Sequence, residues 1–143
     1  MRTAIDTNAI SAFLSREPAA QDIRRMLVKA KQAGGLVISG AVYAELLAYP
    51  NADRAFMDNF LMSTGIQTDF DIRADVWIKA GEAFSSYAER RREHKAGHPK
   101  RILADFLIGA HALLEADRLL TLDKHLYQTS FPKLKLIASS QNL

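Results

Sequence analysis

Short apolar runs along the chain alternate with longer stretches in which apolar residues recur every three or four positions. The short runs predict β-strands, and the longer stretches predict amphipathic helices. We expect strands at 2–6, 36–38, 66–70, 119–123 and 135–138, and helices at 8–15, 19–33, 40–49, 52–63, 72–96 and 100–116, with a short turn or helix at 124–127. This alternation is typical of an α/β fold with a mostly parallel sheet of four to five strands, in which 135–138 would be an edge strand.

The long helix predicted at 72–96 carries a stripe of apolar and aromatic residues. The stripe consists of Ile72, Val76, Ala80, Phe84 and Tyr87, and Trp77 widens it. A packed helix face produces this spacing, so we interpret the aromatic residues as core and not as a platform for nucleobases.

Two predicted helices contain an acid in surroundings that are apolar nearly all round, which implies burial on most sides. Glu45 is the only charge within 40–49, and Asp105 is the only acid within 102–114. An unpaired buried carboxylate costs several kcal/mol, or its pKa shifts and it becomes neutral. Each acid therefore needs a cation, a hydrogen-bond network or a metal ion. For Glu45, a structural salt bridge or a single exposed position remains an alternative.

Two further residues in the second of these helices have structural interpretations. A glycine in a helix interior costs about 1 kcal/mol relative to alanine, so Gly109 indicates a close packing contact. His111 is interpreted as a partly buried histidine with a hydrogen-bond partner, and not as a metal ligand.

Two more acids, Asp6 and Asp123, end apolar runs that are predicted to be strands, and each lies close to a threonine. Either acid alone could simply cap the following helix, because aspartate is a common capping residue. In a parallel sheet, however, strand ends and helix starts meet at one edge, so Asp6, Glu45, Asp105 and Asp123 can converge there. Two carboxylates 4 Å apart repel by about 4 kcal/mol at an effective dielectric of 20, so a cation must hold such a cluster. Oxygen ligands alone favour Mg²⁺ or Mn²⁺ over zinc.

Composition narrows the class of protein. A chain of 143 residues with 48% hydrophobic and 24% charged residues is expected to form one domain over 1–143. The absence of cysteine excludes disulfides and thiol chemistry, and it suits the reducing cytoplasm, where we expect the protein. No apolar run is long enough for a membrane span, and Asp6 interrupts the only short run that a signal peptide could use.

Positive charge is concentrated in one segment. Residues 89–101 contain six Lys or Arg and two Glu, a net charge of +4, whereas the whole chain is only +3. The six cations are Arg90, Arg91, Arg92, Lys95, Lys100 and Arg101. The segment is either a solvated helix end or a patch that contacts phosphates, and we favour the patch because the helix that contains Asp105 follows directly. His94 and His98 have the spacing of helical metal ligands, but Gly97 and Pro99 argue against a continuous helix there.

Four short motifs, in this order and spacing, resemble those of the PIN-domain ribonucleases, in particular the VapC-type toxins of prokaryotic toxin–antitoxin pairs. The motifs are Ile5-Asp6-Thr7-Asn8, Ala44-Glu45-Leu46, the run from Ala104 to Ala112 around Asp105, and Leu120-Thr121-Leu122-Asp123. The resemblance implies a three-layer α/β/α fold with the four acids as catalytic and metal-binding residues and with Asn8 and Thr121 as polar supports. It also implies a homodimer and an antitoxin partner that blocks the site.

The function expected from this resemblance is divalent-metal-dependent endonucleolytic cleavage of RNA by a metal-activated water. Many relatives carry another acid just after the fourth, whereas this chain has Lys124, His125 and Leu126, so one or two metal ions remain possible. One alternative is a phosphatase of the haloacid-dehalogenase type with Asp6 as nucleophile, but that motif needs an acid where this chain has Asn8. The other alternative is a non-catalytic module that binds RNA or protein on the same fold.

Overall fold

The computed structural model describes residues 1–95 and 100–138 of the chain. The five strands are β1 (Thr3–Ile5), β2 (Leu36–Ser39), β3 (Ile66–Asp69), β4 (Arg118–Leu120) and β5 (Leu136–Ile137). The helices in the described ranges are α1 (Thr7–Leu14), α2 (Ala20–Ala33), α3 (Gly40–Leu46), α4 (Arg54–Thr64), α5 (Ala74–Glu93), α6 (Leu103–Glu115) and α7 (Lys124–Ser130). Each strand and helix falls where the hydrophobic pattern predicts one, with ends that differ by a few residues.

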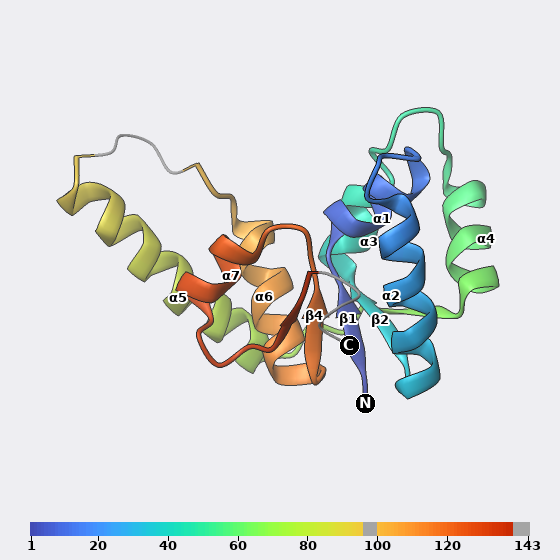
Figure 1. The fold of residues 1–143 in the computed structure, drawn as a ribbon. Helices are drawn as coiled ribbons and strands as arrows, with labels where there is room; N and C mark the ends of the chain where they lie inside the picture. The colour runs from blue at the N-terminus through green and yellow to red at the C-terminus, as the bar shows by residue number, and fades with distance from the viewer. Residues whose placement is uncertain (96–99, 139–143) are drawn as a thin grey trace.

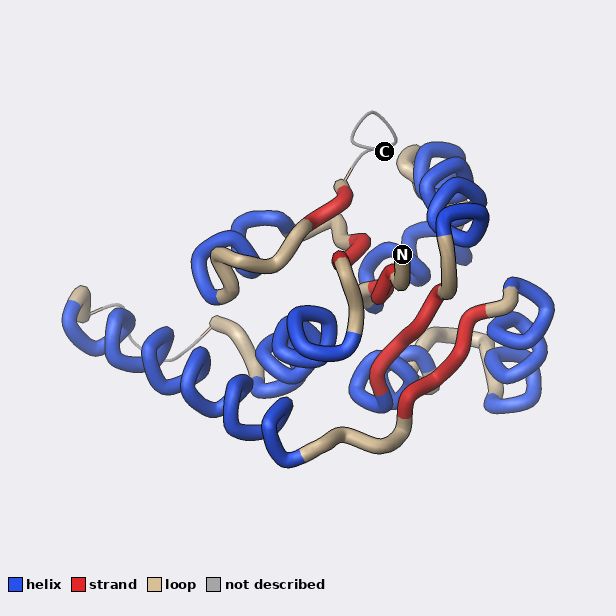
Figure 2. Tube along the Cα trace, turned by 90° about the horizontal axis from the view of Figure 1, so that it is seen from below, coloured by secondary structure: helices blue, strands red, loops and turns tan. Residues whose placement is uncertain are grey.

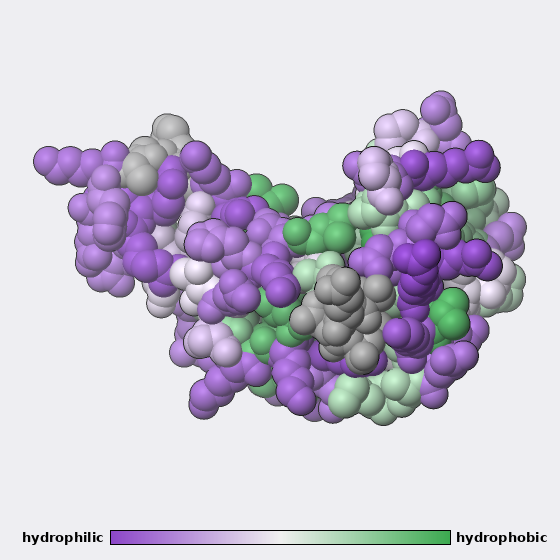
Figure 3. All heavy atoms as spheres, viewed as in Figure 1, coloured by the Kyte–Doolittle hydropathy of each residue, from purple (hydrophilic) through white to green (hydrophobic). Residues whose placement is uncertain are grey.

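The sheet is parallel throughout and has the strand order β3-β2-β1-β4-β5. The predicted α/β fold with five strands is therefore confirmed, and β5 is an edge strand as expected. Figures 1 and 2 place α2 and α4 on one side of the sheet and α5, α6 and α7 on the other, which gives three layers. The carboxyl ends of the strands point upward in Figure 1, toward a hollow that Figure 3 shows between two hydrophilic lobes.

Local sequence explains where several helices begin and end. Ser39 is the last residue of β2, and its hydroxyl accepts a hydrogen bond from the amide of Val42, which caps α3. At the end of α4, Gly65 adopts the left-handed conformation (φ 71°) that favours glycine. The buried apolar residues of β1, β2, β4 and α6 form the centre of the core.

The two interpretations within α6 are confirmed. A Cβ added to Gly109 would lie 2.2 Å from a ring carbon of Phe131, so this position requires a glycine. His111 is buried, and its Nε2 lies 3.1 Å from a carboxylate oxygen of Asp69 at the end of β3. The hydrogen-bond partner predicted for His111 is therefore Asp69.

Two predictions about burial are wrong. Trp77 on α5 is 49% exposed, and only Val76 and Ala80 on that helix are fully buried. The reason is that α5 packs mainly along α6, with a smaller contact to α7, so only a narrow stripe of it is covered. Helix α3 also ends earlier than expected and buries only Val42 and Leu46, which leaves its remaining surface partly open.

Candidate active site

The candidate site lies at the carboxyl ends of β1 and β4, the two neighbouring strands between which the order of strand addition reverses. From β1 the chain adds β2 and β3 on one side, and β4 and β5 extend the sheet on the other. Ligands in open α/β sheets bind at such a switch point, because the loops after the two strands diverge and leave a crevice. The register pairs Ile5 with Leu120, so Asp6 directly follows β1 and Asp123 follows β4 at the same edge.

Asp6 is the most deeply buried of the four acids, with an exposed fraction of 5%. Its Oδ1 accepts a hydrogen bond from the amide of Thr7 (2.8 Å), and its Oδ2 accepts one from the hydroxyl of Thr121 (2.8 Å) and one from the hydroxyl of Tyr127 (2.9 Å). Burial raises the pKa of Asp6 to about 6, against the lowering effect of these bonds, and the charge of Glu45 adds to the increase. Asp6 is therefore ionised at neutral pH and held in one orientation.

Asp6 also caps α1, which is the alternative role that its sequence position suggested. Capping uses only Oδ1, and it explains neither the burial nor the two hydroxyl donors on Oδ2. The same double role recurs at Asp123, whose side chain caps α7 through the amide of Leu126. The capping and functional interpretations of these acids are thus compatible.

Glu45 approaches the site from α3, which packs against α1. Its Oε1 accepts a short hydrogen bond from the hydroxyl of Thr7 (2.6 Å), the residue next to Asp6. The side chain is half-buried and, among the described residues, forms no salt bridge. A structural ion pair therefore does not account for Glu45, and its nearness to Asp6 raises the pKa of that neighbour.

Asp105 lies in the first turn of α6 and is half-buried. Its Oδ2 accepts a hydrogen bond from the amide of Ile102 (3.1 Å), which closes the start of the helix. A carboxylate at this end of a helix is stabilised by roughly 0.3–1 kcal/mol through the helix dipole. The bond to the Ile102 amide also fixes the position of this carboxylate at the start of α6.

Asp123 is paired with Arg101, whose Nη1 lies 2.7 Å from Oδ2 of the carboxylate. About a third of each side chain is exposed, so the pair contributes little to stability but neutralises charge at the edge of the site. We predicted Arg101 to contact RNA, and the structure instead places its guanidinium on the fourth acid. RNA binding by Arg101 is compatible with this pairing only if the guanidinium contacts Asp123 and a phosphate at the same time.

The two predicted polar supports lie within the cluster and connect its parts. The hydroxyl of Thr121 donates to Asp6 and accepts from the amide of Asp123 (3.0 Å). The side-chain oxygen of Asn8 accepts from the amide of Leu122 (3.1 Å), and its amide nitrogen is 3.5 Å from the Thr121 hydroxyl. Together they fix the loop after β4 against the start of α1.

Tyr127 is a site residue that sequence reasoning missed. It is 1% exposed, and burial raises the pKa of its hydroxyl, as do the charges of Asp6, Asp105 and Asp123. Three of the four acids thus act on one buried phenol, which remains a hydrogen-bond donor at any physiological pH. The available signal was its spacing, because Tyr127 follows Asp123 by four residues and so returns to the same side of a helix.

The carboxylates have the donor chemistry of an Mg²⁺ or Mn²⁺ site but are not arranged as a closed cage. Within residues 1–95 and 100–138, no three acidic or histidine side chains are grouped so as to hold one ion directly. Mg²⁺ commonly keeps several waters and is bound by one or two carboxylates, so a set built on Asp6 and Asp105 fits its chemistry. A lysine, a histidine and a leucine follow Asp123, so this loop adds no fifth acid.

The six predicted RNA-binding cations are divided by the structure into two groups. Arg90, Arg91 and Arg101 line a cavity of about 260 Å³ between α5 and α7, and Arg92, Lys95 and Lys100 are exposed and do not line it. Residues 96–99, which include His98, lie outside the described residues. The prediction that His94 and His98 do not share a continuous helix therefore stays a prediction.

A family model for the PIN domain matches residues 3–132. This chain belongs to the PIN-domain family. PIN-domain proteins of toxin–antitoxin systems are generally nucleases, and PIN nucleases typically use divalent metal ions. The comparison with curated proteins finds no relative.

Several solved structures share the fold of this PIN domain. VapBC2 from Rickettsia felis, solved bound to a DNA fragment from its promoter, has a TM-score of 0.67 at 22% identity, with 96% of this chain and 98% of that chain covered. VapBC-1 from nontypeable Haemophilus influenzae has a TM-score of 0.65 at 21% identity, with 99% of each chain covered. FitAcB from Neisseria gonorrhoeae has a TM-score of 0.64 at 18% identity, again with 99% of each chain covered. The described part of this chain contains no helix that could cross a membrane.

Proposed function

We propose that this PIN domain is a divalent-metal-dependent endoribonuclease, with Asp6, Glu45, Asp105 and Asp123 as its catalytic and metal-binding residues. The observation that carries the proposal is the environment of Asp6, which is buried at the switch point of the sheet, fixed by three hydrogen-bond donors and still ionised at neutral pH. A structural cap does not require a carboxylate to be held in this way. Phosphodiester hydrolysis does, because it needs charged ligands in fixed positions.

Each residue of the candidate site has its own proposed role. Asp6 and Asp105 would hold Mg²⁺ or Mn²⁺, with Glu45 contributing directly or through water and Asp123 completing the site. When bound, such an ion supplies a water of lowered pKa and neutralises charge on phosphoryl oxygens. Thr121 and Tyr127 fix Asp6 through its Oδ2, so its Oδ1 keeps a lone pair that can face a ligand. The hydroxyl of Thr7, the residue next to Asp6, orients Glu45 in the same way.

We further propose that the protein is the toxin of a type II toxin–antitoxin pair, that it forms a homodimer and that a cognate antitoxin covers the site. Structures with the same fold are described as VapBC assemblies and as a toxin–antitoxin complex from Klebsiella pneumoniae. Large apolar side chains are exposed on α4 and α5, among them Phe56, Met62, Trp77 and Ile78. The exposed residues of α4 and those of α5 lie on opposite sides of the sheet, and a protein partner could bury either set.

The surroundings of Asp6 argue against the phosphatase alternative. The phosphatase motif needs a second acid two residues after the nucleophilic aspartate. That position is Asn8, an amide whose side chain holds the loop after β4. No observation favours that function over RNA hydrolysis.

Incubation with total cellular RNA, followed by mapping of the new ends, tests the proposal. With Mn²⁺ we expect a small number of defined cleavage sites, and with EDTA we expect none. RNA that is bound but left intact in Mn²⁺ would support the non-catalytic module instead. Identical fragments in EDTA would contradict the metal dependence.

A further inference from the structure

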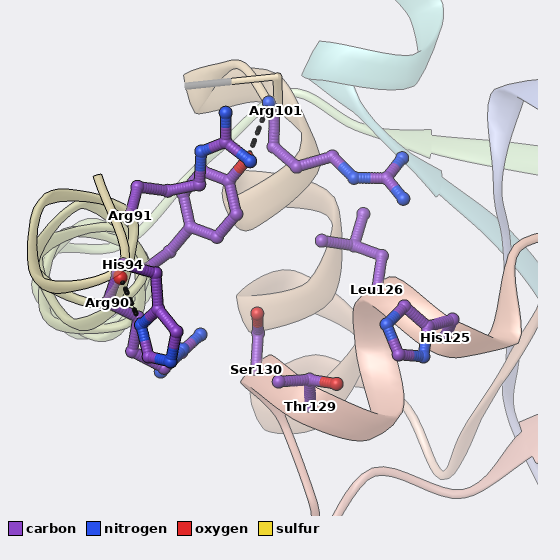
Figure 4. Close-up of a pocket in the computed structure, with 9 residues that line it drawn as sticks. Arg90, Arg91, His94, Arg101, His125, Leu126, Thr129 and Ser130 are labelled. Carbon is purple, nitrogen blue, oxygen red and sulfur yellow. Dashed lines mark hydrogen bonds between the residues drawn. The ribbon is translucent and has the colours of Figure 1, made fainter. Parts of the chain in front are cut away.

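The cavity between α5 and α7 has the charge and the side chains of an anion site. Three arginines line it, namely Arg90, Arg91 and Arg101, and the hydroxyls of Thr129 and Ser130 lie on its other wall. Figure 4 shows Arg90 and His94 on α5 facing Thr129 and Ser130 on α7 across an open space. None of the described residues that line it is acidic. These side chains favour an anionic ligand with several acceptor oxygens.

The wall that carries Arg101 is held in place by hydrogen bonds. The hydroxyl of Tyr87 on α5 accepts from the backbone amides of Lys100 (2.9 Å) and Arg101 (3.2 Å). At the other end of the side chain, the guanidinium of Arg101 is bound to Asp123. On α5, the His94 ring donates through Nδ1 to the carbonyl of Arg90 (2.9 Å). The Arg101 guanidinium and the His94 ring are therefore positioned before any ligand arrives, which lowers the ordering cost of binding.

Arg101 also connects the cavity to the acidic cluster. The same side chain lines the cavity and pairs with the fourth acid, so the cavity and the candidate active site share a wall. A ligand in the cavity could therefore contact Arg101, which itself contacts Asp123. The volume of about 260 Å³ lies below the range of roughly 300–1,000 Å³ of pockets for drug-sized ligands, so it suits a single nucleotide unit and not an RNA helix.

We propose that this cavity is a phosphate subsite, which binds one phosphate of the RNA on the strand that runs into the acidic cluster, away from the bond that is cut. Arginine suits this ligand because its planar guanidinium donates two parallel hydrogen bonds to phosphate oxygens. The proposal rests on the proposed RNA function for the identity of the ligand. It assigns different roles to cations that adjoin in sequence, with Arg90 inside the subsite and Arg92 outside it.

RNA binding in EDTA tests the subsite separately from cleavage. Fluorescence anisotropy with a short single-stranded RNA of mixed sequence is recorded over a range of KCl concentrations for the wild type, Arg90→Gln and the matched control Arg92→Gln. Both changes remove one charge from the same helix. We expect Arg90→Gln to weaken binding about tenfold and to reduce the slope of log K against log salt by about 0.7, because one phosphate contact is lost. Arg92→Gln should change affinity less than about twofold, since general attraction is spread over the whole surface.

A second arm identifies the source of the phosphate. The same RNA is compared with and without a 5′-phosphate. A gain in affinity from the 5′-phosphate that disappears in Arg90→Gln would assign a terminal phosphate to the subsite, and equal affinities with the tenfold loss retained would assign an internal phosphodiester.

Three results would overturn the proposal. The first is an equal loss in the two variants, which would indicate a diffuse basic face, and the second is an unchanged affinity in Arg90→Gln. The third is the absence of RNA binding by the wild type in EDTA. Thermal melts of both variants check that the fold is intact. The binding assay contains no metal ion, so it tests the subsite independently of cleavage. RNA binding as predicted here, together with no cleavage in Mn²⁺, would support the subsite and contradict the proposed nuclease function.

Discussion

At the scale of single residues, Asp6 makes the metal-free fold sensitive to pH. An aspartate whose pKa is raised on folding destabilises the folded state once it ionises, because the unfolded chain releases the proton more readily. The pKa of Asp6 rises from 3.8 to about 6, which corresponds to a loss of about 3 kcal/mol. The loss is absent below pH 4, grows between pH 4 and 6, and is complete above pH 6. A bound cation should reverse it, because the cation stabilises the charged form.

Changing Tyr127 to Phe should extend this window to higher pH. The phenol donates a hydrogen bond to Asp6 that favours its charged form, so its loss raises the pKa of Asp6 further. We expect Tyr127→Phe to lower the free energy of unfolding by about 1.5–3 kcal/mol at neutral pH, and by less near pH 5, where Asp6 is protonated. Urea unfolding in EDTA at the two pH values measures the difference. A loss that is equal at both would show that Tyr127 supports packing and not the charge of Asp6.

At the scale of helices and strands, the periodicity of the sequence predicts each element, because buried strands and amphipathic helices leave clear patterns. The four acids stay a prediction, made from their places at strand ends and in apolar helices. Burial was harder to predict. The aromatic stripe on α5 suggested a core position for Trp77, but the width of a buried stripe depends on how many neighbours a helix has. Tyr127 was missed for a related reason, since the run after Asp123 contains few apolar residues and does not reveal that α7 continues to Ser130.

Two glycines at helix interiors should respond in opposite directions to substitution by alanine. Gly109→Ala would force a methyl group into the buried ring of Phe131, and we expect a loss of about 1–3 kcal/mol in the free energy of unfolding. Gly81→Ala on α5 is the matched control, because a Cβ there meets no atom within 4 Å, and helix propensity should stabilise the fold by up to about 1 kcal/mol. Urea unfolding curves give both values. Stabilisation by Gly109→Ala would show that Phe131 is not packed against α6.

At the scale of the whole molecule, the site depends on strand order, which no local pattern encodes. Asp6 and Asp123 lie at the same edge because β1 and β4 are neighbours, and a sheet with the same strands in another order would separate them. The pairing of Arg101 with Asp123 was likewise hidden, since 22 residues separate them and the basic segment suggested a contact with phosphates. The sequence therefore singles out four acids as a candidate site, and the fold shows which hydrogen-bond and ion-pair partners each of them has.

Cleavage of one defined RNA by three proteins tests the central claim most directly. The proteins are the wild type, Asp105→Asn and the control Asp75→Asn, which neutralises an exposed acid in the first turn of α5. We expect Mn²⁺-dependent cleavage by the wild type and the control and none by Asp105→Asn, because asparagine keeps the shape of the side chain but not the charge that holds the ion. The melting temperatures of the three should be similar. Full cleavage by Asp105→Asn in Mn²⁺, or undiminished cleavage by the wild type in EDTA, would contradict a metal-dependent site built on these acids.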